Sequence, residues 1–288
     1  MAASGAETRL NGLGTRWQTL GLGDRAICFA LLAVTATLNS QAADIVASLY
    51  VHGALGAIAS LLGINAIIWF ALFAVARIAL DGDVARPLQR GDAAVLTAMF
   101  LAVLLPFAAA SSLAVFASGL WLWLTADAGS RLRRMAIVLL ALSGTLVWGR
   151  VLLALFGDQL LAIDGQFVAL ISGTQATANV VDFVDGTQFV IASKCSSLHN
   201  MSLSFVIWAS LTHLLEVPMT RRLFGFALFS AAMMVLINGI RLAVMAHYPA
   251  QFDELHYGLA ADLFSWTALL IAMLIAMWGV YDAAHRRI

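Results

Sequence analysis

The sequence predicts an all-α polytopic membrane protein with about eight transmembrane helices. Its 288 residues are 62% hydrophobic and only 11% charged, with a mean hydropathy of +0.91. Soluble domains carry roughly 25% charged residues. Several apolar stretches approach the ~20 residues that a helix needs to cross the hydrocarbon of a bilayer. The long segment between the fifth and sixth stretches predicts a small extracytoplasmic helix and a β-hairpin.

Each predicted span is an apolar stretch bounded by polar or charged residues. The spans cover residues 26–46, 57–80, 92–109, 111–127, 134–156, 196–215, 222–246 and 260–282. The first is the weakest, because Asn39, Gln41 and Asp44 interrupt its second half. The third and fourth form a tight hairpin around residues 106–112.

The basic residues are distributed unevenly across the predicted membrane. When successive spans alternate in direction, all but three of the 16 basic residues fall on the side of the N-terminus, and the exceptions are Arg150, Lys194 and Arg241. Positively charged loops tend to stay in the cytoplasm, so both termini are expected inside. Residues 1–25 are polar and Gly-rich, which predicts a cytoplasmic tail rather than a cleaved leader.

The organisation along the chain predicts four parts. They are a cytoplasmic tail (1–25), a five-helix membrane scaffold (26–156), an extracytoplasmic loop with a hairpin (157–194) and a three-helix catalytic membrane region (195–288). No internal repeat or low-complexity run interrupts this order.

The extracytoplasmic loop contains both of its predicted elements in sequence order. Residues 158–171 predict an interfacial helix or a re-entrant piece. Two β-prone runs, 177–183 and 187–192, flank Val184-Asp185-Gly186, and Asp-Gly is a strong hairpin signal. The hairpin leads directly into Ser193-Lys194-Cys195, and its edge offers a docking strand for an extended peptide.

The two cysteines are predicted at opposite levels of the membrane. About 30 Å of hydrocarbon separates Cys28 from Cys195, which excludes a disulfide between them. Cys28 fits a small buried hydrophobic position. Cys195 is an unpaired thiol facing an oxidising compartment, which indicates a reactive role or an intermolecular bond. Its place at a helix start beside Lys194 favours the thiolate, and a purely structural cysteine is the alternative.

Asn238 and Arg241 lie three residues apart and so share one face of the seventh span. A charged side chain inside a membrane helix indicates a functional site, where Arg241 would stabilise an oxyanion or hold a substrate carbonyl. Alternatively, Arg241 reaches the outer headgroups or pairs with Asp262. Asn238 would orient Arg241 or a histidine, or form a plain interhelical hydrogen bond.

Three histidines are candidates for the base that must reach the thiol by a hydrogen bond. A thiolate–imidazolium pair is the usual active form of such sites. His256 lies in the loop before the last span, and His247 lies at the outer end of the seventh. His199 follows Cys195 by four residues, on the same helix face and roughly 6 Å deeper; its alternative role is a buried, hydrogen-bonded histidine.

The order of these motifs resembles the exosortase/archaeosortase family of membrane cysteine transpeptidases, over the segment from Gly173 to Trp266. The family pattern has a Cys-Ser-Gly-Leu box, an Asn-x-x-Arg helix and a His before the last span. The matching segments are Cys195-Ser196-Ser197-Leu198, Asn238-Gly239-Ile240-Arg241 and His256-Tyr257-Gly258. Ser197 replaces the usual glycine, which either narrows the approach to Cys195 or adds a hydroxyl and so bears on substrate choice.

The resemblance implies a role for each matched residue. Cys195 would be the nucleophile, Arg241 the transition-state stabiliser and His256 the general acid/base. From the residues themselves, Asn238, Ser196, His199 and Lys194 are predicted to support these three, and Arg150 and Ser197 to contact the substrate. Apart from the resemblance, Arg150 either forms a structural ion pair with Asp158 or Asp182 or lines the path of the substrate.

The resemblance also implies a substrate and a location. The substrate would be a secreted protein held by a C-terminal sorting helix among the membrane lipids, with the acyl group passed to a lipid or glycan acceptor. The chain would be a multi-pass protein of the bacterial cytoplasmic (inner) membrane with its site facing the periplasm. Cleavage would need no cofactor or metal, and nucleic acid is not an expected partner.

Two other functions remain open from the sequence. In a transporter or channel subunit, Asp44, Arg150, Arg241 and Asp262 would line a polar path. The chain would otherwise be a non-catalytic accessory protein of envelope polysaccharide assembly. A serine intramembrane protease is disfavoured, because no Gly-x-Ser-x-Gly element pairs with a suitable histidine.

Overall fold

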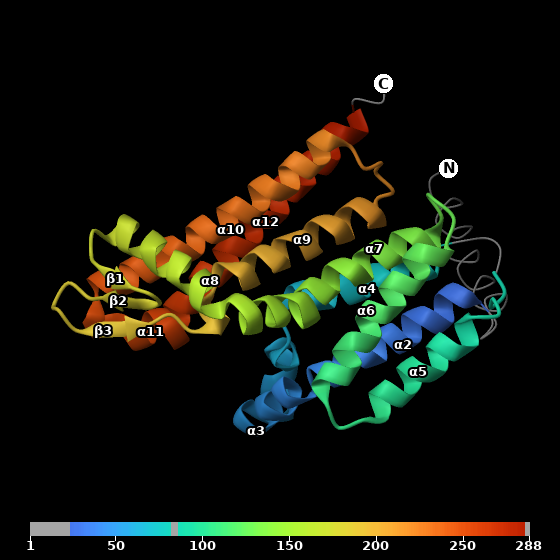
Figure 1. Cartoon of the computed structure of the whole chain (residues 1–288), viewed down its shortest axis with the longest axis horizontal. Coiled ribbons are helices and arrows are strands. Elements are labelled where there is room, and N and C mark those ends of the chain that lie inside the picture. Colours follow the sequence, from blue (N-terminus) through green and yellow to red (C-terminus); the bar gives the residue numbers. More distant parts are fainter. Residues whose placement is uncertain (1–23, 82–85, 286–288) are drawn as a thin grey trace, which may run out of the picture. The chain divides into compact units, whose positions relative to one another are not determined.

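The computed structural model describes residues 24–81 and 86–285, and the chain divides into two compact units between Ser143 and Gly144. The described chain is predominantly helical, with a small sheet in the second unit (Figure 1). The predicted tail, residues 1–25, falls almost entirely outside the described residues. The boundary groups the second half of the fifth predicted span with the predicted catalytic region rather than with the scaffold.

The first unit is a bundle of helices around α2. Its elements are α2 (Arg25–Ser40), α3 (Ala42–Ala59), η1 (Leu61–Gly63), α4 (Ala66–Ala79), α5 (Asp92–Leu104), α6 (Ala108–Thr125) and α7 (Arg131–Ser143). Helix α2 packs against α4, α5 and α6, and α7 packs against α4 and α6. Small residues of α2, such as Ala30, Ala33 and Ala36, are buried and allow this close packing.

The first predicted span, residues 26–46, is wrong at its C-terminal end. Helix α2 stops at Ser40, and Gln41 leaves the helical conformation with φ −104° and ψ 9°. The Asn39 amide turns across the bundle and donates to the Val103 carbonyl at 3.0 Å and to the Ser111 hydroxyl at 2.9 Å. One of the polar residues that weaken this span, Asn39, therefore bonds to other helices close to the point where α2 ends.

The second predicted span, residues 57–80, begins too early. The segment before it belongs to α3, a separate helix that kinks at Gly53, where φ is +67°. Helix α4 begins only at Ala66, because the Asn65 side chain caps it by accepting from the Ile67 amide at 2.9 Å. The loop expected between the first two spans is therefore mostly helical.

Buried ion pairs join the helix ends of the first unit. Arg25 donates to Asp92 at 2.9 Å, and Trp121 Nε1 donates to the same carboxylate at 2.7 Å. Asp24, which caps α2 through the Ala26 amide, also binds Arg131. The sequence assigns Arg25 and Arg131 only as cytoplasmic charges, whereas the structure buries both.

We expect Asp92→Asn to lower the free energy of unfolding by about 3–5 kcal/mol, because Arg25 would keep its buried charge without a counter-ion. Asp127→Asn is the matched control. Asp127 pairs with Arg86 at 2.8 Å, with both side chains more than half exposed, so its loss should cost at most about 1 kcal/mol. Thermal unfolding of the two variants in detergent measures the difference, and equal shifts would contradict the expectation.

The second unit holds every candidate site residue. Its elements are η2 (Gly144–Trp148), α8 (Gly149–Ser172), β1 (Ala176–Thr177), β2 (Val180–Asp182), β3 (Gln188–Val190), η3 (Ser193–Cys195), α9 (Ser197–Leu214), α10 (Arg221–His247), η4 (Pro249–Gln251), α11 (Phe252–Tyr257) and α12 (Leu259–His285). Helix α10 packs against α8, α9 and α12, and α11 packs on α12. The sheet lies beside α8 and α11 at one end of this unit (Figure 1).

The predicted hairpin is confirmed, and the structure adds a third strand. Strands β2 and β3 pair in antiparallel fashion, with Val181 opposite Phe189. The run expected as one strand, 177–183, is broken at Ala178, where φ is +55°, so that β1 folds back on β2. Gly165 of α8 permits this turn, because a Cβ there would lie 2.4 Å from the Ala178 carbonyl oxygen.

A helix is present over the predicted residues 158–171, and it follows the fifth predicted span without a loop. Residues 131–172 are helical throughout, with a π-helical turn at Gly144–Trp148. Phe156 alone leaves the helical region, at φ −130° and ψ 21°. The span was expected to end at this residue, so the transition is a kink rather than a connecting loop.

Five helical stretches of the described chain are long and apolar enough to cross a membrane. They are Ala42–Ala59, Ala108–Thr125, Arg131–Ser172, Arg221–His247 and Leu259–His285. Helices α2, α4 and α5 are apolar but shorter. The chain is therefore a mostly helical, membrane-associated protein. The count of eight spans and the inward orientation of both termini remain predictions.

Candidate functional site

The Cys195 thiol and the His256 imidazole meet in the second unit. Cys195 Sγ lies 3.3 Å from His256 Nε2, although 61 residues separate the two in sequence. Cys195 ends η3 and is 8% exposed, and His256 belongs to the short helix α11. Of the three candidate histidines, His256 is the one that contacts the thiol.

The chain before α9 fixes the position of Cys195. After β3, the short turn η3 closes with a hydrogen bond from the Cys195 amide to the Ala192 carbonyl at 2.8 Å. Ser196 is extended, and its hydroxyl accepts from the His199 amide as the N-cap of α9. The thiol therefore sits one residue before the cap, at the positive end of the helix dipole.

This geometry overturns one expectation for His199. The spacing of four residues predicts a shared helix face only if both residues are helical. Cys195 lies in η3 and Ser196 is extended, so α9 does not begin until Ser197. His199 lies instead within electrostatic reach of Arg150, and both residues are exposed.

Two buried side chains hold the backbone on either side of the thiol. Asn238 Nδ2 donates to the Cys195 carbonyl at 2.8 Å, and Asp164 Oδ2 accepts from the Ser197 amide at 2.9 Å. Asn238 thus forms an interhelical bond that positions Cys195 directly. Asp164 was not among the predicted site residues. Its signal was a carboxylate within an otherwise apolar helix, next to the Gly165 that brings the sheet close.

We expect Asn238→Asp to destabilise the second unit by about 1–3 kcal/mol, because this isosteric side chain has no N–H for the buried Cys195 carbonyl. Asn200→Asp is the matched control, since the Asn200 amide reaches the Ser196 carbonyl only at 3.5 Å and is partly exposed. Denaturant titration followed by Cys195 alkylation reports the local stability. Equal effects of the two changes would refute the positioning role of Asn238.

Arg241 lies one helical turn after Asn238 on α10 and is half-buried. Its Nε is buried, and within residues 24–81 and 86–285 it has no hydrogen-bond partner. The alternative ion pair with Asp262 is not formed among these residues. The Arg241 charge also lowers the pKa of His256, so the guanidinium lies within electrostatic reach of the imidazole.

The surroundings of His256 favour its neutral form. Burial lowers the pKa of His256 below its usual 6.5, the Arg241 charge lowers it further, and Asp253 opposes the shift. The Phe252 ring stacks on the imidazole with centroids 5.4 Å apart and planes at 16°. A lowered pKa leaves the imidazole neutral at pH 7, which favours a general base at rest over the expected imidazolium.

Two substitutions should move the pKa of His256 in opposite directions. Asp253→Asn removes the charge that raises it and should lower the pKa further, whereas Arg241→Gln removes a charge that lowers it and should raise the pKa. NMR titration of histidine Cε1 in nanodiscs measures both shifts, with His256→Gln identifying the signal. Shifts of the same sign would rule out this electrostatic arrangement.

The remaining predicted residues have smaller roles in the geometry. Arg150 forms no ion pair with Asp158 or Asp182 in the described part of the chain. Ser197 contributes its backbone amide to Asp164. Lys194 lies in η3, and its side chain falls outside what the structure describes. Within residues 24–81 and 86–285, no group of three His, Cys, Asp or Glu side chains could hold a metal ion.

Comparison with known proteins identifies no relative. No protein-family model matches the chain, and neither the curated proteins nor the solved structures include a match. The resemblance to exosortases therefore rests on the sequence motifs alone and stays a prediction.

Proposed function

We propose that the chain is an integral membrane cysteine transpeptidase or peptidase of the exosortase type. It cleaves a C-terminal sorting signal from secreted proteins and passes the acyl group to an acceptor at the outer face of the membrane. The 3.3 Å contact between the Cys195 thiol and the His256 imidazole carries this proposal. Arg241, whose charge acts on His256, would supply the third group that acyl transfer needs.

The first half-reaction forms a thioester. Neutral His256 takes the proton of Cys195 through Nε2 while Sγ attacks a substrate carbonyl carbon, so that a C–S bond forms. Arg241 stabilises the negative charge that develops on the carbonyl oxygen. The protonated imidazole then gives its proton to the leaving amine as the C–N bond breaks.

The second half-reaction releases the acyl group. An acceptor amine, hydroxyl or water attacks the thioester carbon, and His256 accepts its proton. The C–S bond breaks, and the thiol is restored when the imidazolium returns the proton to Sγ. Arg241 again faces the oxyanion.

The membrane setting follows from the proposed topology. The site would face the periplasm of a bacterial inner membrane, at the end of α10 opposite the Arg222–Asp282 ion pair. A substrate whose sorting helix spans the same bilayer would present the bond just outside that helix at the level of Cys195. Lipids would surround both helices, and a lipid or glycan precursor is a suitable acceptor.

Trapping the acyl-enzyme tests the reaction class. Without an added amine or hydroxyl acceptor, only water consumes the thioester of the wild-type chain, so acid quenching within the first turnover should capture it. We expect a substrate-derived mass on the Cys195 peptide that hydroxylamine removes, and no such mass in Cys195→Ala. Processing at a wild-type rate without any adduct on Cys195 would refute the proposal.

A further inference from the structure

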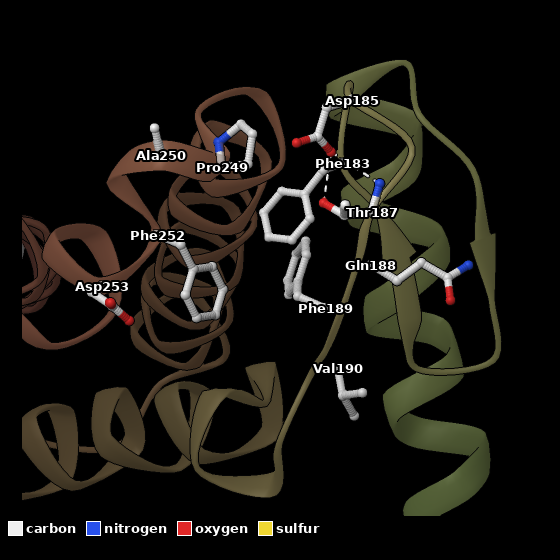
Figure 2. Close-up of a pocket in the computed structure, with 10 residues that line it drawn as sticks. All are labelled: Phe183, Asp185, Thr187, Gln188, Phe189, Val190, Pro249, Ala250, Phe252 and Asp253. Carbon is white, nitrogen blue, oxygen red and sulfur yellow. Dashed lines mark hydrogen bonds between the residues drawn. The ribbon is translucent and has the colours of Figure 1, made fainter.

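A groove opens between β3 and the η4–α11 segment, in the same unit as the thiol–imidazole pair. It has a volume of about 760 Å³ and is called the β3 groove below. Phe183, Phe189 and Phe252 line it, and Asp185 and Asp253 contribute carboxylates (Figure 2). Figure 2 shows the three rings facing one another between the hairpin and the helix.

The aromatic floor of the β3 groove connects it to the base. The ring centroids of Phe183 and Phe189 are 4.9 Å apart, and that of Phe252 lies 5.7 and 5.8 Å from them. Phe252 also stacks on His256, which contacts Cys195. One ring therefore separates the groove from the reacting pair.

Among the described strands, none pairs with the edge of β3 that faces away from β2. Phe183 donates to the Thr187 carbonyl and Ile191 to the Asn179 carbonyl, both at 2.8 Å. Hydrogen-bonded pairs alternate in an antiparallel ladder, so Gln188 and Val190 direct their backbone groups away from β2. β3 is the last strand in the order β1-β2-β3, and an unpaired edge is a template for another strand.

The charge of the β3 groove is negative. Asp185 and Asp253 are both exposed, and none of the described groove-lining residues is basic. Hydrogen bonds from the Thr187 side chain and backbone lower the pKa of Asp185, which keeps that carboxylate ionised at neutral pH. Aromatic faces nearby add attraction for a cation.

We propose that the β3 groove takes an extended peptide segment, which joins the sheet as a further strand on β3 and carries a basic side chain toward Asp185 and Asp253. The inference rests on the proposed function, and the segment is the part of the substrate beside the scissile bond. β3 ends five residues before Cys195, so a strand laid along it runs toward the thiol. Main-chain hydrogen bonds supply affinity, and the carboxylates supply specificity.

Short peptides that end in a thiol-reactive vinyl sulfone test the charge preference. A series carries Lys, Gln or Glu at each position in turn before the reactive group, and mass spectrometry measures the rate of labelling of Cys195 in nanodiscs. At one position we expect Lys peptides to react about tenfold faster than Glu peptides at low salt. In the Asp185→Asn/Asp253→Asn double variant the ratio should fall close to one.

The ratio of two peptide rates within one variant cancels any change in the thiol itself. Equal rates for Lys and Glu peptides at every position, or a preference that survives in the double variant, would overturn the proposed charge selection.

Val190→Pro tests strand addition, because proline removes the amide that faces the open edge. Val190→Thr is the control that keeps the amide and the strand propensity. We expect Val190→Pro to slow labelling by every peptide relative to iodoacetamide, which needs no groove, and Val190→Thr to leave this relative rate as in the wild type. An equal relative rate in both variants would exclude β3 as the docking edge.

Iodoacetamide also separates this inference from the proposed function. If His256→Ala leaves the alkylation of Cys195 unchanged, the thiol–imidazole pair is inert and the proposed function fails. If His256→Ala slows alkylation but the peptides show no charge preference, the active site stands and the β3 groove proposal alone is wrong.

Discussion

A Cys195→Ala variant is expected to release no cleaved substrate while it keeps the fold of the wild-type chain. Without the sulfur no thioester forms, so the rate should fall on the order of 10⁴-fold or more. The alanine variant keeps Cβ in the buried cluster around residue 195 and loses only the sulfur with its hydrogen bond to His256, so the loss of stability should be about 1 kcal/mol. Mass spectrometry of the secreted substrate and thermal unfolding of the purified variant measure the two quantities.

Cys28→Ala is the matched control, because Cys28 lies on α2 in the first unit and, like Cys195, forms no disulfide. It should process substrate at the wild-type rate. Continued processing by Cys195→Ala at a normal protein level would exclude the transpeptidase. It would favour instead the transporter or the accessory protein of polysaccharide assembly, neither of which needs the thiol.

Arg241→Ala should lower the rate of processing about 10²–10³-fold, as the loss of an oxyanion donor does in other acyl-transfer enzymes. Within the described residues its Nε has no hydrogen-bond partner in the resting state, so stability should change little. Arg241→Lys keeps the charge but not the planar fork, and should recover only part of the rate. Single-turnover rates of thioester formation measure the effect.

The unfolding temperature of Arg241→Ala distinguishes a structural role of Arg241 from a catalytic one. A structural arginine would lower the unfolding temperature and the activity together when it is replaced. Replacement of a catalytic arginine would lower the rate of thioester formation and leave the unfolding temperature nearly unchanged. A large loss of stability in Arg241→Ala with a proportionate loss of activity would contradict the catalytic role.

The sequence predicts those secondary-structure elements that depend mainly on interactions between residues close together in the chain. Asp185-Gly186 between two β-prone runs predicts the hairpin, because the conformation of a short turn is decided by the residues of the turn and of its two flanking strands. The third strand was missed, since it depends on Gly165 of a different element giving room to Ala178. The break after α2 was also missed, because Asn39 finds its partners on other helices.

In the candidate site, too, some features follow from nearby residues and others from contacts between distant segments. Cys195, Arg241 and His256 were predicted from motif order, but the choice of His256 over His199 depended on where α9 begins. That start is set by Ser196 and by Asp164, which reaches the Ser197 amide from α8. Asp164 makes a long-range contact that no spacing rule reveals, as do Asp24 and Asp92 in the first unit.

Asn238 and Arg241 are carried by one rigid rod, about 4.5 Å apart along its axis. Asn238, which binds the Cys195 carbonyl, and Arg241 therefore move together if α10 tilts. The His256 imidazole is held by a different element, the six-residue helix α11, which follows Pro249. Under the proposed mechanism, substitutions in α11 would thus change the rate of proton transfer by His256 without displacing Cys195 or Arg241.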